Sequence, residues 1–267
     1  MPDSREDVLI LLNAAEGLLQ VGLAGEGRII AWQECEAAGQ GAERLIPALA
    51  EMLDETGHAR RQISRIACVR GPGSFTGIRL ALTTAFGLSR SICGPGDEGP
   101  RLAGLDYLPL LAASALAETK NLPADLAALW TLTHARRGQV NMQGFTPDGL
   151  PLAQPETVTL SDAVRKIEQQ SANLPGSFAL LGSGLARNRE ELTCALPGAL
   201  LLPETYNHPA PEAMLRLAGA AAYGHDPIEP LYLRPCDAEE NLPGIAAGLG
   251  LDPKEAALAL KRLQTRI

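Results

Sequence analysis

The sequence is poor in aromatic residues and paired cysteines, and it has no long apolar run. Aromatic residues make up 4% of the 267 residues, so a core has to be filled by Ala, Leu, Ile and Val. No stretch of about 18 apolar residues is free of charge, so we expect no membrane span. The five cysteines form no Cys-x-x-Cys pair, which fits reduced thiols in a cytoplasm better than a disulfide framework or a zinc site: Cys35, Cys68, Cys93, Cys194 and Cys236.

The charge balance argues against a nucleic-acid-binding chain. The formal net charge is −8, and an acidic surface repels a phosphate backbone. Arg60, Arg61, Arg65 and Arg70 could still form a local basic patch, or could simply be a solvated helix end and loop. The polar and acidic start, Met1–Asp7, does not resemble a secretory signal, so we expect a cytoplasmic protein.

Hydrophobic periodicity predicts an α/β protein with the order β-β-β-α-β-α-β-α in its first part. Three short strands with tight connections form an antiparallel meander, and later strands alternate with helices. The predicted strands are 8–12, 18–24, 28–34, 63–69 and 102–105, and the predicted helices are 42–56, 77–91 and 107–118.

The second part of the chain carries weaker signals, beginning at a joint near Asn121–Pro123, and it shows no internal repeat. The patterns predict a hairpin, a helix capped near Ser161, and an appended C-terminal helix. The predicted strands are 126–133, 139–145, 177–181 and 230–234, and the predicted helices are 161–170, 211–223 and 252–267.

We therefore expect three parts: an N-terminal lobe over residues 1–106, a C-terminal lobe over 107–235, and a tail with a helix over 236–267. Whether the helix 211–223 packs back on the N-terminal lobe is left open, as is the role of the tail.

A glycine-rich loop links the strand 63–69 to the next helix, where amide groups and the helix dipole can hold an anion. It lacks the lysine of a Walker motif, its third glycine comes one residue too late for a dinucleotide motif, and Pro72 breaks a nucleophile elbow. The alternative is a tight turn capped by Ser74 or Thr76, with weak nucleotide binding left open. The loop is Gly71, Pro72, Gly73, Ser74, Phe75, Thr76 and Gly77.

This loop, with Ile78-Arg79 and the run 82–88, closely resembles the signature of the TsaB (YeaZ) family. Further segments agree, and together they cover roughly Val8 to Arg234: 42–47, 135–140, 181–184 and 230–234.

The resemblance implies an actin/hexokinase/Hsp70-like fold with two related lobes, each with a mixed sheet and flanking helices. It also implies a non-catalytic subunit that pairs with TsaD and, with TsaE, serves the transfer of a threonylcarbamoyl group from threonylcarbamoyl-AMP to adenosine 37 of tRNAs that read codons beginning with A. On this reading the chain needs no cofactor or metal of its own, touches tRNA only indirectly, and could also form a homodimer.

Several departures from the family pattern count against chemistry at the loop. Asn13 stands where the family has an acidic residue, Gly41 where it has a histidine, and His134 where it has an aspartate. No two histidines are four residues apart, so the metal-binding pair of the catalytic relatives is missing. Ser183 has no evident catalytic partner. An ATP-binding or peptidase-like enzyme using the glycine loop is the alternative hypothesis.

Two predicted helices carry apolar stripes that could meet a partner in a four-helix arrangement, either TsaD or a second copy. The same stripes could instead bury against the chain's own sheet, or both could hold on different sides of each helix. The residues proposed for this interface are Leu45, Leu49, Met52, Ile78, Arg79, Leu82, Ala85 and Phe86.

Overall fold

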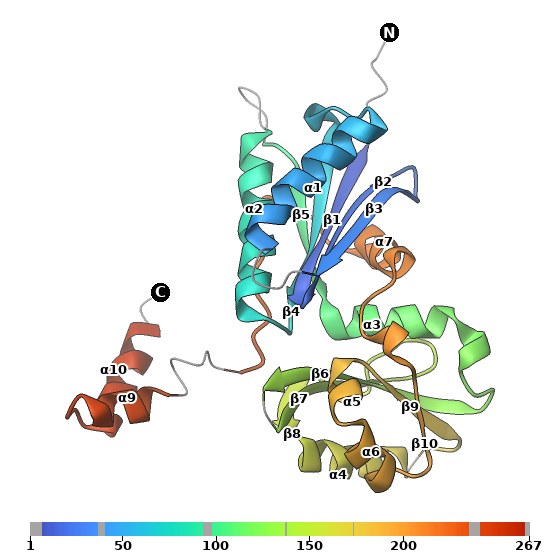
Figure 1. Ribbon diagram of the computed structural model, residues 1–267, viewed down its shortest axis with the longest axis vertical. Coiled ribbons are helices and arrows are strands. Elements are labelled where there is room, and N and C mark those ends of the chain that lie inside the picture. The colour runs from blue at the N-terminus through green and yellow to red at the C-terminus, as the bar shows by residue number, and fades with distance from the viewer. Residues whose placement is uncertain are drawn as a thin grey trace. The chain divides into compact units, whose positions relative to one another are not determined.

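The structure is a computed structural model that describes residues 7–36, 41–92, 98–136, 138–172, 174–234 and 241–264 (Figure 1). It divides into two compact units, Met1–Leu231 and Tyr232–Ile267. The first unit holds two five-stranded sheets, each the centre of one lobe. Among the described residues, no helix combines the length and the apolar character needed to cross a bilayer.

The first sheet has the strand order β3-β2-β1-β4-β5. The first three strands form the predicted antiparallel meander, and β4 and β5 then run parallel to β1. Because β1 and β4 each have a neighbouring strand on both sides, they carry buried apolar runs, 8–12 in β1 and 66–69 in β4. The strands are β1 (Val8–Glu16), β2 (Leu18–Gly25), β3 (Arg28–Glu36), β4 (Ile63–Gly71) and β5 (Arg101–Asp106).

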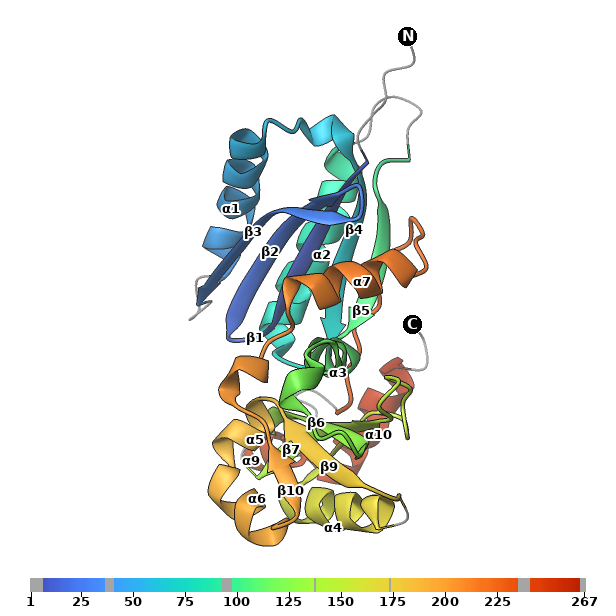
Figure 2. The same cartoon turned by 90° about the vertical axis from the view of Figure 1, so that its right-hand side faces the viewer.

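Helices cover both faces of this sheet (Figure 2). The helices α1 (Gly41–Thr56) and α2 (Phe75–Ser91) share one face, and α2 packs along β1 and β4. The helices α3 (Tyr107–Ala117) and α7 (Pro211–Ala220) lie against the other face and against each other. The predicted helix 211–223 ends at Ala220, and it packs on the first sheet, a point that the sequence leaves open.

The second sheet repeats the topology of the first, with the order β8-β7-β6-β9-β10. Three antiparallel strands are again followed by two parallel ones, so the two lobes are related although their sequences show no repeat. The elements are β6 (Leu126–Arg136), β7 (Gln139–Phe145), β8 (Glu156–Thr159), α4 (Leu160–Ser171), β9 (Ser177–Leu181), α5 (Ser183–Arg187), α6 (Arg189–Ala195) and β10 (Ala199–Leu201).

The helix α3 joins the two lobes into one core. It follows β5 of the first sheet, yet it also packs against β6 and β7 of the second. Buried residues continue through it from Ile10 and Val69 in the first lobe to Leu129 and Leu181 in the second. A second buried cluster, centred on Trp130, fills the far face of the second sheet. The expected fold, two related α/β lobes with mixed sheets, is confirmed.

Some predicted elements differ from the structure. Residues 230–234 are not a strand: Leu231 makes one backbone bond to Arg70, but Pro230 has no N–H and β4 is already paired on both sides. The cap of α4 is Thr159 rather than Ser161, because the helix starts at Leu160. The short strands β8 and β10 and the helices α5 and α6 were not predicted.

The second unit contains two helices, α9 (Leu242–Gly248) and α10 (Pro253–Gln264). Only the second was predicted. Its expected end at Ile267 lies outside the described residues, as do Cys93, Cys236 and Arg137.

Candidate functional site

The glycine-rich loop packs directly against the end of β1. The amide of Ser74 donates to the carbonyl oxygen of Ala15 (2.5 Å), and the Ser74 hydroxyl accepts from the amide of Gly77 (3.2 Å). The amide of Ile78 donates to the Ser74 carbonyl (2.9 Å). The Ile78 bond is the first bond of the helix itself, whereas the amides of Ser74 and Gly77 are engaged by the loop and are not available to an anion.

The glycines of this loop are required by the close approach of two backbones. A Cβ atom on Gly73 would overlap the carbonyl oxygen of Ala15, and one on Gly77 would overlap that of Ala14. Ser74 is the N-cap of α2, which begins at Phe75 rather than Gly77. The loop therefore behaves as the tight, capped turn that the sequence offered as the alternative to an anion cradle.

Asn13 lies beside this loop and is fully buried. Its side-chain amide donates to Gln20 Oε1 (2.7 Å), and its Oδ1 accepts from the amide of Ala15 (2.9 Å). Gln20 in turn donates to Glu34 Oε1 (2.8 Å) and to the Pro209 carbonyl (3.0 Å). The amide of the Asn13 side chain thus links β1 to β2, and its oxygen binds the backbone within β1, so the residue that replaces the family's acid has a structural role here.

Most residues predicted for the partner interface face the core. The side chains on α1 and α2 with an exposed fraction of 9% or less are Leu45, Leu49, Met52, Ile78, Leu82 and Ala85. Arg79 is exposed and Phe86 is half-buried. A partner approaching the folded chain can therefore contact Arg79 and Phe86 but not the other six. Whether this surface binds a partner stays a prediction.

The outward faces of the two helices differ in charge. The helix α2 has two cationic side chains and no acidic one, and both cations lie over aromatic rings: Arg79 is 3.8 Å from the ring centre of Phe75 and Arg90 is 5.4 Å from that of Phe86. The neighbouring α1 carries Arg44 and exposes Ile46 (48%), together with four acidic residues, Glu43, Glu51, Asp54 and Glu55.

The junction of the lobes holds a polar group that the sequence analysis did not single out. Glu16, the last residue of β1, accepts a hydrogen bond from the Ser183 hydroxyl at the start of α5 (2.7 Å). Burial raises the pKa of Glu16 to about 7, against the opposing effects of Ser183 and Arg187. The signal in the sequence was an acidic residue at the end of an otherwise apolar strand.

His134, which replaces the family's aspartate, lies at the same junction. Its backbone amide donates to the Ser183 hydroxyl (2.9 Å). Burial, and then the nearby Arg187, lower the pKa of the His134 imidazole. Gly41 simply begins α1. Among the described residues, no three His, Cys, Asp or Glu side chains are placed to hold a metal ion.

Cavities on the described part of the first unit include one that opens beside Gln20 and one that opens beside His58. The larger, about 460 Å³, has three carboxylates and no Lys or Arg in its lining, which disfavours a phosphate ligand. It is lined by Leu18, Gln20, Glu34, Ser114, Glu118, Glu204, Thr205, Tyr206, His208, Pro209, Ala210 and Pro211.

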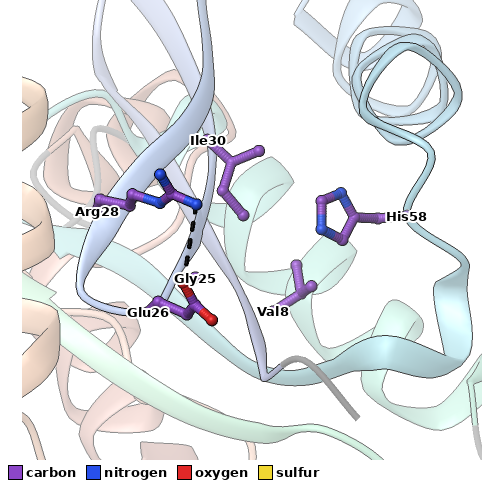
Figure 3. A pocket seen from close by; sticks show the side chains of 6 residues that line it. All are labelled: Val8, Gly25, Glu26, Arg28, Ile30 and His58. Atoms are coloured by element: carbon purple, nitrogen blue, oxygen red, sulfur yellow. Dashed lines mark ion pairs between the residues drawn. The ribbon is translucent and has the colours of Figure 1, made fainter. Parts of the chain in front are cut away.

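The smaller cavity, about 140 Å³, is below the size of ordinary ligand pockets (Figure 3). It lies beside the exposed ion pair of Arg28 with Glu26 (3.7 Å). Its lining is Val8, Gly25, Glu26, Arg28, Ile30 and His58.

Comparison with known proteins matches this arrangement to one group. The chain is 26% identical over 243 residues to the tRNA threonylcarbamoyladenosine biosynthesis protein TsaB of Escherichia coli, covering 88% of this chain and 98% of that protein. The TsaB protein of Bacillus subtilis is 26% identical over 132 residues, which is 49% of this chain and 52% of that protein. The chain is a homologue of these TsaB proteins. The resemblance to the TsaB (YeaZ) family is thereby confirmed.

Comparison with solved structures supports the same fold. YeaZ from Pseudomonas aeruginosa superimposes with a TM-score of 0.62 at 22% identity, over 85% of this chain and all of that one. A family model described as TsaD, tRNA N6-adenosine threonylcarbamoyltransferase, matches residues 35–142. This segment runs from β3 to β7 and includes the glycine-rich loop, so the likeness to the TsaD model centres on the first lobe.

Proposed function

We propose that this chain is a non-catalytic subunit in the biosynthesis of threonylcarbamoyladenosine in tRNA. In this role it binds and activates TsaD, with TsaE in the same assembly, for transfer of the threonylcarbamoyl group to adenosine 37. The observation that carries the proposal is the likeness to E. coli TsaB over 98% of that protein's length.

The glycine-rich loop supports an accessory role. Its amides at Ser74, Gly77 and Ile78 are bound within the chain, and Asn13 carries no charge that could organise a metal-bound phosphate. The large cavity is lined by carboxylates and no cation, so it suits a nucleotide poorly. These features weigh against an ATP-binding or peptidase-like enzyme that uses the loop.

The outer surface of α1 and α2 is the surface that we propose for the partner. The guanidinium of Arg79 lies over the Phe75 ring, 3.8 Å from its centre, a contact that favours this position of the side chain before binding. Half-buried Phe86 and exposed Ile46 supply apolar area beside it. An aromatic and arginine anchor with an apolar neighbour is a common composition for the centre of an interface. A second copy of the chain could use the same surface.

Reconstitution tests this role. The chain is mixed with TsaD, TsaE, threonylcarbamoyl-AMP and substrate tRNA, and modified adenosine is measured with and without it. We expect co-elution with TsaD and a loss of at least tenfold in modification rate when the chain is omitted. Absence of a complex together with an undiminished rate would refute the proposal.

A charge reversal combined with the truncation of a ring on α2 tests whether this surface binds TsaD. Arg79→Glu combined with Phe86→Ala should abolish co-elution with TsaD. The matched control is Arg28→Glu, on the β2–β3 turn, because Arg28 is also exposed and its partner Glu26 is exposed as well. Equal effects of the two changes would show that the surface of α2 is not the binding surface.

A further inference from the structure

Glu16 connects the two lobes through its side chain. It ends β1 in the first lobe, and its Oε1 accepts from the hydroxyl of Ser183, 167 residues later in the chain (2.7 Å). The same Ser183 oxygen accepts from the backbone amide of His134 at the end of β6 (2.9 Å). A line of hydrogen bonds therefore runs from the first sheet through α5 to the second sheet.

The other oxygen of this carboxyl group is the unusual one. Oε2 of Glu16 is buried and has no hydrogen-bond partner among the described residues. The Tyr107 hydroxyl lies close to the carboxyl group and has the smallest lowering effect on the Glu16 pKa, while it donates to the carbonyl of Asn207 (3.0 Å) and lies 3.4 Å from His208 Nδ1. An ionised Glu16 therefore buries a bare oxygen, whereas a protonated Glu16 has an O–H to donate to the Tyr107 oxygen.

The charged groups around Glu16 only partly offset the free-energy cost of burying its ionised carboxyl group. Arg187 of α5 attracts the ionised form, but its side chain is exposed and water screens the attraction. Burial lowers the pKa of the His134 imidazole, which favours its neutral form. Tyr107 has a pKa raised well above its ordinary value and stays neutral. Burial remains the largest effect on Glu16.

We propose that Glu16 is a proton-dependent latch between the two lobes: its protonated form holds the junction closed, and its ionisation favours opening of the contact with α5. The inference is independent of the proposed partner, since it concerns β1, β6, α3 and α5 only. In an enclosed junction the carboxyl group keeps its proton up to about pH 7, and in an opened one water stabilises the anion at lower pH.

The sign of the pH effect follows from linkage. Burial holds the pKa of Glu16 at about 7 in the closed form, and exposure returns it to 4.5. Between these values the closed form binds more protons, so closing weakens as pH rises. The opening constant should increase about tenfold from pH 5.5 to 7 and level off above about pH 8.

Amide hydrogen exchange of the whole chain measures this opening at residues 132–136 and 183–188, after correction for the intrinsic pH dependence of exchange. The unmodified chain should lose about tenfold in protection from pH 5.5 to 7. Glu16→Gln, which keeps an oxygen to accept from Ser183, should stay protected at pH 8. The matched control Glu191→Gln, an exposed residue on α6, should behave as the unmodified chain does.

Two further measurements keep the proposal open to refutation if Glu16→Gln does not fold. Ser183→Ala removes the hydrogen bond between the lobes and should lower protection at every pH while the pH dependence remains. Carbon-13 NMR titration of the Glu16 carboxyl in the unmodified chain should give a pKa near 7. A pKa near 4.5, or the same pH dependence in the unmodified chain and Glu16→Gln, would overturn the latch.

Discussion

The two lobes share a strand order but differ in how far each element extends. In the first lobe the strands have 6 to 9 residues, whereas β8, β9 and β10 of the second have 4, 5 and 3. The 17-residue helix α2 corresponds in order to two short helices, α5 and α6, with 5 and 7 residues. One topology thus supports a 17-residue second crossover helix in the first lobe, whereas the longest helix described in the second lobe, α4, has 12 residues.

Both lobes nevertheless use glycine where their second parallel crossover begins. In the first lobe Gly77 lies on the carbonyl of Ala14 at the end of β1. In the second lobe Gly184 lies on Leu132 of β6, where a Cβ atom would be 2.9 Å from the Leu132 carbonyl carbon. The close approach of loop and strand is therefore a property of the topology rather than of a ligand site.

The largest effect that we predict comes from adding a methyl group at these contacts. Gly77→Ala should lower the free energy of unfolding by more than about 4 kcal/mol, because the new Cβ meets a backbone oxygen that cannot move aside. Gly184→Ala should cost about 1–3 kcal/mol, since its contact is less close. Urea denaturation followed by circular dichroism measures both.

Gly87→Ala is the control for this pair. Gly87 lies within α2 and has no atom within 4 Å of the added Cβ, so alanine should stabilise the helix by about 0.5–1 kcal/mol. If Gly77→Ala had the same free energy of unfolding as the unmodified chain, the packing of the glycine-rich loop against β1 would not be a main source of stability in the first lobe.

A tryptophan lies over a cross-strand glycine in each lobe. Trp32 on β3 faces Gly22, and Trp130 on β6 faces Gly144. A Cβ atom on either glycine would come within 2.6 Å or 2.7 Å of the ring. The lobes differ in burial, because Trp130 is 1% exposed and Trp32 is only half-buried.

Truncating the two tryptophans should lower the free energy of unfolding more in the second lobe than in the first. Trp130→Ala should cost about 3–5 kcal/mol, as large core truncations do. Trp32→Ala should cost about 1–2 kcal/mol, because water already reaches its ring. Chemical denaturation curves of the two variants provide the measurement. Equal losses would mean that the far face of the second sheet is not an independent core.

Each lobe also carries a row of polar side chains across its three antiparallel strands. In the first lobe, Asn13 donates to Gln20 (2.7 Å). In the second, Asn141 donates to Thr133 (3.2 Å) and accepts from Thr157 (2.7 Å). The acceptors differ: the Gln20 oxygen can only accept, while the Thr133 hydroxyl can turn and donate.

Replacing each asparagine by aspartate should therefore lower the free energy of unfolding by different amounts in the two lobes. Asn13→Asp should cost about 2–3 kcal/mol at pH 7, because an anionic oxygen would face the Gln20 oxygen. Asn141→Asp should cost about 1 kcal/mol, because the Thr133 hydroxyl can donate to the carboxylate. The loss for Asn13→Asp should shrink as pH falls, since a protonated Asp can donate to Gln20. A loss that did not change with pH would contradict this account.

The sequence predicted the first lobe better than the second for a physical reason. Long buried strands and amphipathic helices carry a clear period, so the order from β1 to α3 is confirmed. Strands of three or four residues, such as β8 and β10, have no period to detect and depend on their neighbours. The symmetry of the lobes stayed hidden because equivalent positions hold different residues, such as Asn13 and Thr133.

The sequence also predicts the candidate functional site less completely than the fold. An apolar stripe predicts burial but not the surface that buries it, so Leu45 and Ile78 were assigned to a partner and lie in the chain's own core. A single acidic residue after an apolar run is typical of a solvated strand end, so the sequence does not predict a buried role for Glu16. Its meeting with Ser183 depends on the tertiary fold, and no local pattern encodes it.

The smallest predicted effects concern the helix caps, one in each lobe. Ser74 caps α2 and Thr159 caps α4, each accepting an amide hydrogen bond of 3.2 Å. Ser74→Ala and Thr159→Ala should therefore each cost about 1 kcal/mol. The Thr159 hydroxyl also donates to Asp162 (2.8 Å) and is the main cause of the lowered pKa of that carboxyl. Thr159→Ala should raise this pKa towards its ordinary value, which NMR titration detects; a pKa that did not move would assign the effect to Arg165 instead.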